Sequence, residues 1–238
     1  MMTITDKLLT MGGSHGRPGT KMEPKGVVIH YVGNPGSSAI GNRNYFENTG
    51  VASAHYIIDI SGEIIRCVPD NECAWHAGVS YGSQWNSMAA TNNSRFIGIE
   101  CCHPDAGGKF SDKTRTALIE LVATLCNKYG WTVQKDVYRH YDVTGKSCPM
   151  FYVNNSAEWD KLKNDIIAKL NQIKQPTTPP APPAPPAPPN NQPSDWAKEA
   201  WAWAKTNNLN DGTRPRDTTT REEVAAIVWR ASKFLSSK

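Results

Sequence analysis

Residues 26–33 read GVVIHYVG, a short apolar run rich in β-branched residues and bounded by glycines. Such a run is typical of a strand buried in a sheet. The stretch RFIGIECC at 95–102 has the same character and predicts a second buried strand. Between them, AHYIIDI and EIIRCV flank Ser61-Gly62, a dipeptide that favours a β-hairpin. These stretches predict a central mixed β-sheet.

Two amphipathic stretches predict helices that cover this sheet. Residues 112–130 place four apolar side chains on one helical face, and Gly130 closes the helix; the four are Leu118, Leu121, Val122 and Leu125. Residues 156–173 likewise place apolar side chains on one helical face, namely Trp159, Leu162, Ile166, Ile167 and Leu170. We therefore expect one α/β domain at 1–174.

The first residues, MMTITDKLLTMGG, lack the apolar core and the small-residue cleavage site of a signal peptide. We expect residues 1–13 to form a disordered leader and the protein to be made in the cytoplasm. No stretch of the sequence approaches the roughly 20 apolar residues that cross a membrane, so no membrane insertion is expected.

Ten of the chain's seventeen prolines fall in residues 175–193. Proline fixes φ and removes a donor, so this segment is expected to be a polyproline II spacer. At about 3.1 Å per residue, it would separate its flanking domains by roughly 40 Å. Residues 194–238 then predict a small module of two helices. So short a segment has a marginal core.

The formal net charge is only +4, with no run of five like charges. A dedicated nucleic-acid binder concentrates Lys and Arg on one element, so that class is not favoured. The six cysteines show no CxxC pairing, and in a reducing cytoplasm most are expected to be small buried side chains.

His30, His140 and Cys148 are candidate ligands for Zn²⁺. Two imidazoles and one thiolate leave the fourth tetrahedral position open for water, as catalytic zinc sites do. The histidines lie far apart in sequence, so from residue types and positions alone buried core histidines remain the alternative.

Two charged residues strengthen the metal hypothesis. Lys146 stands two residues before Cys148, and in extended backbone both side chains would point to the same side. Its ammonium could then stabilise an oxyanion. Glu100 ends the apolar strand and could act as a general base and acid. A solvated strand end is the alternative for Glu100.

Five stretches of the sequence, in order, resemble the zinc-dependent amidase family (amidase type 2) of phage-type N-acetylmuramoyl-L-alanine amidases and peptidoglycan recognition proteins. They span nearly the whole first domain and read VVIHY, SAHYIIDISGEI, AWHAG, IGIE and HYDVTGKSCP. The resemblance implies that family's mixed sheet with covering helices. It makes His30, His140 and Cys148 the zinc ligands.

The resemblance also assigns roles around the metal. Lys146 matches a carbonyl-polarising lysine and Glu100 a catalytic glutamate. Some relatives have a tyrosine where this chain has Ala54, which leaves Glu100 as the acid/base candidate. His76 resembles a substrate-contacting histidine, with Trp75 beside it as a platform for sugar or stem peptide. Simple packing of this loop is the alternative for both.

Residues 194–234 resemble a single S-layer-homology-like repeat, although the turn between its helices is shortened. Such repeats bind secondary polymers of Gram-positive walls. The resemblance implies a wall-binding role for Trp196, Trp203, Arg214 and Arg216. A dimerisation hairpin is the alternative, and the oligomeric state is left open.

The function implied is peptidoglycan hydrolysis between N-acetylmuramic acid and L-alanine. Zinc-activated water would attack, with Glu100 as general base and acid and Lys146 stabilising the oxyanion. A phage endolysin that acts on a Gram-positive wall after its release fits best. A peptidoglycan-binding protein without activity and a zinc endopeptidase that cuts within the stem peptide are the alternatives.

Overall fold

The structure is a computed structural model that describes residues 2–79, 81, 82, 84, 91–175, 192–210, 219 and 221–236. The chain divides into two compact units, Met1–Pro176 and Thr177–Lys238. The expected proline-rich spacer lies almost wholly outside the described residues, and so do Arg214 and Arg216. None of the described helices is long and apolar enough to cross a membrane.

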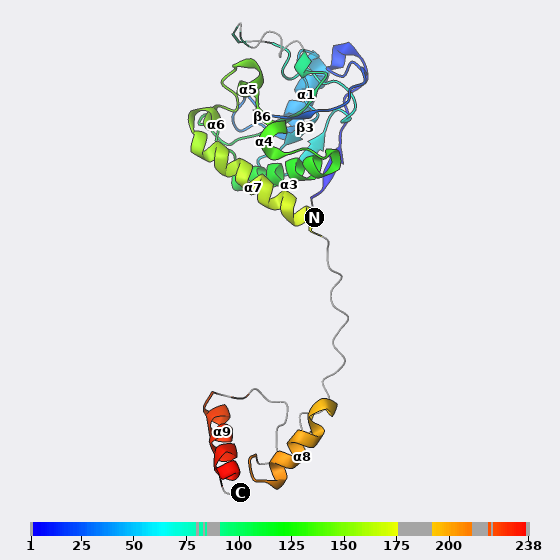
Figure 1. Cartoon of the computed structure of the whole chain (residues 1–238). Coiled ribbons are helices and arrows are strands. Elements are labelled where there is room, and N and C mark those ends of the chain that lie inside the picture. Colours follow the sequence, from blue (N-terminus) through cyan, green and yellow to red (C-terminus); the bar gives the residue numbers. More distant parts are fainter. Residues whose placement is uncertain are drawn as a thin grey trace. The chain divides into compact units, whose positions relative to one another are not determined.

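Within the described residues, a six-stranded sheet forms the centre of the first unit, in the order β1-β4-β3-β5-β2-β6 (Figure 1). The strands are β1 (Ile4–Asp6), β2 (Gly26–Tyr31), β3 (Tyr56–Ile58), β4 (Ile64–Arg66), β5 (Phe96–Cys101) and β6 (Val137–Arg139). Neighbouring strands run parallel except β3 and β4, which form the hairpin expected around Ser61-Gly62. The predicted mixed sheet is confirmed.

The expectation of a disordered leader at residues 1–13 is wrong. Residues Ile4–Asp6 form β1, which pairs with β4 at the edge of the sheet. Leu9 is buried beside Ile57 and Ile65, and the Arg66 guanidinium donates two hydrogen bonds to the Asp6 carboxylate. The segment is ordered because it supplies both a strand and an apolar side chain to the first unit.

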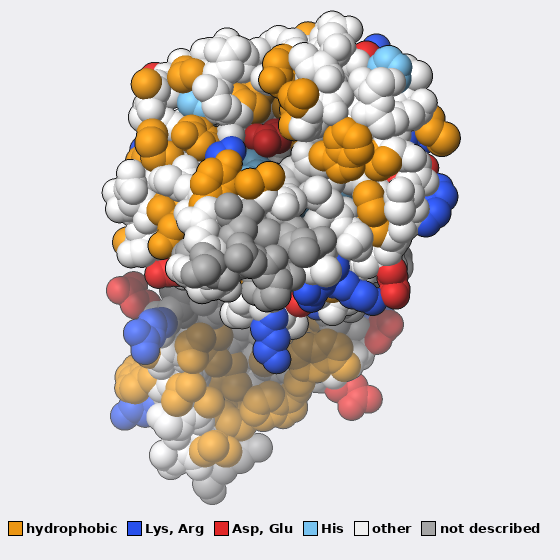
Figure 2. Space-filling model, turned by 90° about the horizontal axis from the view of Figure 1, so that it is seen from above, with side chains coloured by type: hydrophobic (Ala, Val, Ile, Leu, Met, Phe, Trp, Pro, Cys, Tyr) orange, Lys and Arg blue, Asp and Glu red, His pale blue; other side chains and the backbone are white. Residues whose placement is uncertain are grey.

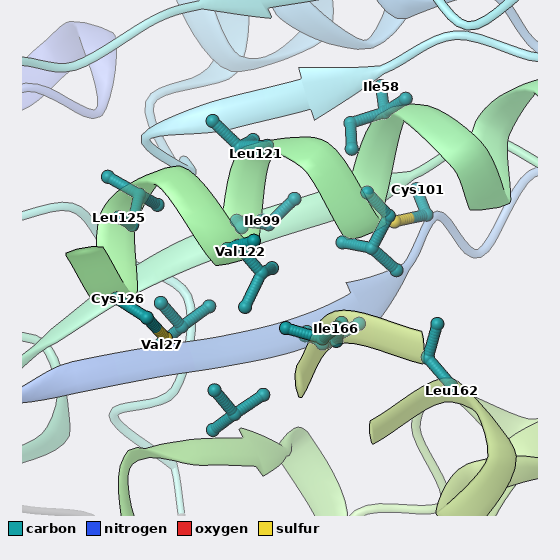
Figure 3. Close-up of a cluster of buried hydrophobic side chains, with 14 of the residues drawn as sticks. Val27, Ile58, Ile99, Cys101, Leu121, Val122, Leu125, Cys126, Leu162 and Ile166 are labelled. Carbon is teal, nitrogen blue, oxygen red and sulfur yellow. The ribbon is translucent and has the colours of Figure 1, made fainter. Parts of the chain in front are cut away.

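Two long helices cover one face of the sheet, α3 (Asp112–Tyr129) and α7 (Ser156–Lys174). Both lie where the amphipathic pattern predicts them, and they pack against each other. The Ser111 hydroxyl accepts a hydrogen bond from the Thr114 amide at the start of α3, and Gly130 ends it with a left-handed φ of 71°. Figure 3 shows side chains of α3 and α7 meeting those of the strands.

The opposite face of the sheet packs on α1 (Ala39–Thr49), which the sequence analysis did not predict. Alternation along β3 places Ile57 in the cluster with Phe46 of α1, whereas Tyr56 and Ile58 join the α3 cluster. Only Ala39 and Phe46 of this helix are buried, so its apolar stripe is too short to stand out. Three short helices follow α3 along the chain: α4 (Val133–Asp136), α5 (His140–Thr144) and α6 (Met150–Asn154).

The second unit contains a 3-10 turn, Asp195–Ala197, and two helices, α8 (Lys198–Thr206) and α9 (Arg221–Ser236). Trp203 of α8 meets Phe234 of α9 edge to face, with ring centroids 5.8 Å apart. Leu209 is the one hydrophobic side chain that is fully buried among the described residues of this unit.

Candidate metal centre

The centre lies where three parallel strands end at the same edge of the sheet. His30 of β2 is paired in register with Glu100 of the neighbouring β5. Strand β6, on the other side of β2, ends at Arg139, and His140 opens α5 directly after it. Polar side chains at the carboxyl ends of adjacent parallel strands converge, which is where open α/β sheets place their ligands.

His30, His140 and Cys148 meet at this edge. One potential ligand atom from each lies within 4.8 Å of the others, and all three residues are buried. The Sγ atom of Cys148 is 3.9 Å from Nδ1 of His30, and the two imidazole centroids are 4.4 Å apart. The structure thus brings together the three residues that the sequence analysis selected.

The surroundings of these three side chains fit a metal ion. Neither ring nitrogen of His140 has a hydrogen-bond partner in the described part of the chain, although the residue is buried. A buried imidazole without a partner is costly unless something else satisfies it. Ligand atoms around a tetrahedral zinc lie roughly 3.4 to 3.7 Å apart, close to the separation of Sγ and Nδ1.

The protonation of the candidate ligands suits this role. Burial, together with the neighbouring His140, His76 and Lys146, lowers the pKa of His30 well below its ordinary value. Burial and the charge of Lys146 lower the pKa of His140 to about 3. Both imidazoles are therefore neutral, with lone pairs to offer. Burial raises the pKa of the Cys148 thiol, so its thiolate needs a cationic partner.

Glu100 faces the same centre. Its Oε1 lies 3.9 Å from Nδ1 of His30, and its buried Oε2 is without a hydrogen-bond partner among the residues described. Burial raises the pKa of this carboxyl to about 8, against the opposing charge of Lys146. A carboxyl that titrates near neutrality can both take and give a proton. Glu100 is therefore not a solvated residue at the end of a strand.

Lys146 reaches the centre by a different backbone geometry from the one expected. Helix α5 ends at Thr144, Gly145 adopts a φ of 81°, and the Cys148 amide donates to the Lys146 carbonyl over 2.7 Å. The backbone here turns tightly and is not extended, so the same-side argument for Lys146 and Cys148 is wrong. The ammonium nevertheless lies close enough to oppose the rise in the pKa of Glu100 and to help lower the pKa of His140.

Two neighbours of the centre have structural roles. Asp142 accepts hydrogen bonds from the backbone amide and the side chain of Arg139, the N-cap residue of α5. Asp142 thus helps to orient this helix. It makes no hydrogen bond with a ring nitrogen of His140. His103 is buried, with its ring nitrogens 2.6 and 2.7 Å from the carbonyl oxygens of Asp105 and Val32. His103 is therefore held by backbone carbonyls within the fold.

His76 lies beside the candidate ligand His30, and Trp75 precedes it in the same loop. His76 contacts Nε2 of His30 through its Nδ1, at 3.0 Å, a contact that sequence reasoning missed because 46 residues separate the two histidines. Burial, and to a smaller extent the nearby His55, lowers the pKa of His76 to about 3. Trp75 is half-buried, and its amide donates to the Ser53 hydroxyl. A direct contact of these two residues with substrate stays a prediction.

One face of the first unit is hollowed. Figure 2 shows an acidic side chain at the bottom of a hollow, with basic and histidine side chains beside it and hydrophobic side chains around it.

The fold and this candidate centre fit a hydrolase, and comparisons with known proteins identify the family. Residues 20–151 match the family described as N-acetylmuramoyl-L-alanine amidase. The chain belongs to this amidase family.

Named relatives agree with this assignment. The chain is 39% identical over 164 residues to the N-acetylmuramoyl-L-alanine amidase BlyA of Bacillus subtilis (strain 168), covering 65% of this chain and 44% of that protein. It is 38% identical over 149 residues to the amidase CwlL of Bacillus licheniformis, covering 60% of this chain and 41% of the relative. The chain thus spans less than half the length of these curated relatives.

Solved structures show the same architecture. A mutant endolysin from Bacillus subtilis has a TM-score of 0.56 and 31% identity, covering 70% of this chain and 99% of that one. The catalytic domain of XlyA has a TM-score of 0.55 and 29% identity, with coverage of 69% and 99%. The similarity extends over nearly the full length of these two structures.

Proposed function

We propose that the chain is a zinc-dependent, endolysin-like amidase that cleaves peptidoglycan between the lactyl group of N-acetylmuramic acid and L-alanine of the stem peptide. One observation carries the proposal. In a chain of the amidase family, two neutral imidazoles and a cysteine thiol converge in a buried centre beside a carboxyl that has an unpartnered oxygen among the described residues.

His30, His140 and Cys148 would hold the metal. Zinc bound there supplies Lewis acidity and lowers the pKa of water to about 7. Glu100 accepts a proton from the attacking water at its carboxylate and passes it to the departing nitrogen. The C–N bond breaks, leaving a carboxylate on the lactyl group and a free amine on L-alanine. The Lys146 ammonium stabilises the negative charge on the attacked carbonyl oxygen.

The fragments that the protein releases test the bond assignment. Purified Gram-positive cell walls are digested, and the fragments are analysed by mass spectrometry. Stem peptides with a free L-alanine amine are the expected product. Fragments that retain muramyl-alanine would assign the cut to a zinc endopeptidase, and no release would leave a peptidoglycan-binding protein.

Glu100→Gln is the matched control for this digestion, because the amide keeps the size of the side chain without its acid–base function. We expect it to lower the rate by about 10²- to 10⁴-fold while zinc still binds. A rate equal to that of the wild type would exclude Glu100 as the proton carrier.

We further propose that the second unit binds a secondary polymer of the wall. Trp196 and Trp203 are exposed in the described structure, and aromatic surfaces of this kind stack on sugars or other flat groups. Arg214 and Arg216 would meet the negative charge of the polymer. Such a unit would keep the amidase at the cell wall. Sedimentation of the protein with purified cell walls, compared with that of the Trp196→Ala variant, tests this role.

A further inference from the structure

His76 stands between His30 and the backbone of β5. Its Nε2 lies 2.9 Å from the carbonyl oxygen of Phe96, and its Nδ1 lies 3.0 Å from Nε2 of His30. Both ring nitrogens of His76 are therefore engaged inside the protein. The two imidazoles meet almost at right angles, with centroids 5.1 Å apart.

These contacts determine where the protons lie. A carbonyl oxygen only accepts, so the proton of neutral His76 is on the Nε2 atom that faces Phe96. Its Nδ1 then has a lone pair and accepts from His30, which must donate through Nε2–H. The other nitrogen of His30, Nδ1, is left without a proton. That atom is 3.9 Å from both Sγ of Cys148 and Oε1 of Glu100.

The chain makes room for the His76 ring. A Cβ at position 98 would lie 2.5 Å from Cγ of His76, so the imidazole can rest against β5 only because residue 98 is glycine. The Gly98 amide, in turn, donates to Nδ1 of His55, whose ring also lies next to that of His76. A side chain at position 98 would push His76 off the Phe96 carbonyl.

The backbone of the His76 loop is clamped as well. The Asn93 side-chain oxygen accepts hydrogen bonds from the amides of His76 and Ala77, at 3.0 and 2.9 Å. The side-chain nitrogen of Asn92 donates to the carbonyls of Ala77 and Val143, which ties the loop to α5. The loop is thus anchored to the helix that begins with His140.

We propose that His76 is a positioning residue that fixes the tautomer of His30, holding its Nδ1 free and directed at the metal. The relay runs from the Phe96 carbonyl through His76 to Nε2 of His30. It deepens the proposed function, because it concerns the same metal centre, and it gives His76 a role that acts through His30 and requires no contact with substrate. Partners of this kind orient metal ligands and raise their basicity.

The tautomer can be observed directly in the full-length wild-type protein. Two-bond ¹H–¹⁵N correlation spectra of ¹⁵N-histidine-labelled protein, recorded without metal and with one equivalent of zinc, distinguish the two forms of each imidazole. We expect His30 and His76 both protonated at Nε2 in the two samples, and zinc to shift Nδ1 of His30. A His30 protonated at Nδ1, or zinc binding through its Nε2, would overturn the proposal.

This spectrum separates the inference from the proposed function. If zinc changes no histidine resonance, the metal mechanism of the amidase fails, whereas the metal-free spectrum still reports whether His76 sets the tautomer of His30.

Two substitutions test the consequence for zinc affinity, measured by competition with a chelator. His76→Leu removes the acceptor at similar size and is expected to weaken zinc binding by about 10- to 100-fold. His76→Asn offers its side-chain oxygen near the position of Nδ1 and is expected to retain most of the affinity. His15→Asn serves as the control, since His15 bonds to the Glu47 carbonyl and to no candidate ligand.

Thermal unfolding of the metal-free variants checks that each is folded. Wild-type affinity in His76→Leu, or equal weakening in His76→Leu and His76→Asn, would contradict the proposed role. If His76→Leu does not fold, the tautomer of His30 measured in the wild-type protein decides whether the proposal holds.

Discussion

Tryptophan behaves in opposite ways in the two units of the chain. In the first unit, Trp131 and Trp159 are only 9% and 7% exposed and belong to the cluster beneath α3 and α7. In the second unit, Trp196 is 89% exposed and Trp229 is 62% exposed. Trp131 and Trp159 therefore belong to a core, whereas Trp196 and Trp229 lie at a surface.

The first unit also buries polar groups. The first unit buries two histidines, a cysteine and a glutamate at the end of its sheet, where water is scarce and electrostatic interactions are strong. That burial requires the large core that the sheet and its helices provide. The comparison teaches that the candidate centre depends on a rigid, dry interior, whereas the proposed attachment to a wall would need only exposed aromatic side chains on a small scaffold.

The Cys148→Ser substitution is expected to have the largest effect. It leaves the apolar core intact and removes the thiol sulfur, the soft ligand of the candidate metal centre. We expect zinc affinity to fall by more than about 100-fold, beyond what the loss of an orienting partner causes. Clearing of purified walls in a zymogram should be lost with it. Equal clearing by the variant and the wild type would rule out this centre as the catalyst.

Lys146→Met should have the next largest effect. It keeps the length of the side chain and removes the charge that acts on Glu100 and His140. Because loss of one oxyanion-stabilising group costs about 10²- to 10³-fold, we expect kcat to fall by that amount with zinc affinity nearly unchanged. Steady-state kinetics on soluble muropeptides measures the change in kcat. A change confined to KM would instead assign Lys146 to substrate binding.

Asp70→Asn tests whether buried polar groups of the first unit also stabilise it away from the metal. Burial alone would raise the pKa of Asp70, but hydrogen bonds from Lys128, Tyr56 and Tyr129 lower it overall. The stabilisation is therefore complete above the unfolded pKa of about 4 and is lost as pH falls through the folded value. We expect a loss of about 1 to 3 kcal/mol at neutral pH.

Thermal unfolding at several pH values checks this prediction. The difference in Tm between the wild type and Asp70→Asn should be constant from about pH 7 to 5 and should close below about pH 4. A difference that widened on acidification would have the wrong sign for a carboxylate stabilised by hydrogen bonds.

The sequence was sufficient to predict the sheet, its two long helices and the three candidate ligands. Strands β2 and β5 are apolar throughout, and α3 and α7 carry long apolar stripes, so local patterns alone identify them. The candidate ligands stand out because their residue types suit zinc and because the surrounding stretches resemble an amidase family.

Other features depend on contacts between distant segments and leave little trace in the sequence. The edge strand β1 has three residues, and only its pairing with β4 reveals it. The His30–His76 contact joins residues on different elements, and the turn at Lys146 depends on one hydrogen bond within a loop. Gly98 offered a partial signal, since a glycine inside an apolar strand indicates close approach of another group.

Trp196→Ala, the mildest change, tests the surface side of the comparison. Because this side chain is almost fully exposed, its loss should leave the Tm unchanged and weaken sedimentation with purified walls by about three- to tenfold, or roughly 0.5 to 1.5 kcal/mol. Trp159→Ala, at a buried tryptophan, is the matched control and should cost about 3 to 5 kcal/mol of stability. Unchanged sedimentation of Trp196→Ala would mean that exposure of this tryptophan does not serve attachment to the wall, and a dimerisation role for the second unit, measured by sedimentation equilibrium, would then take precedence.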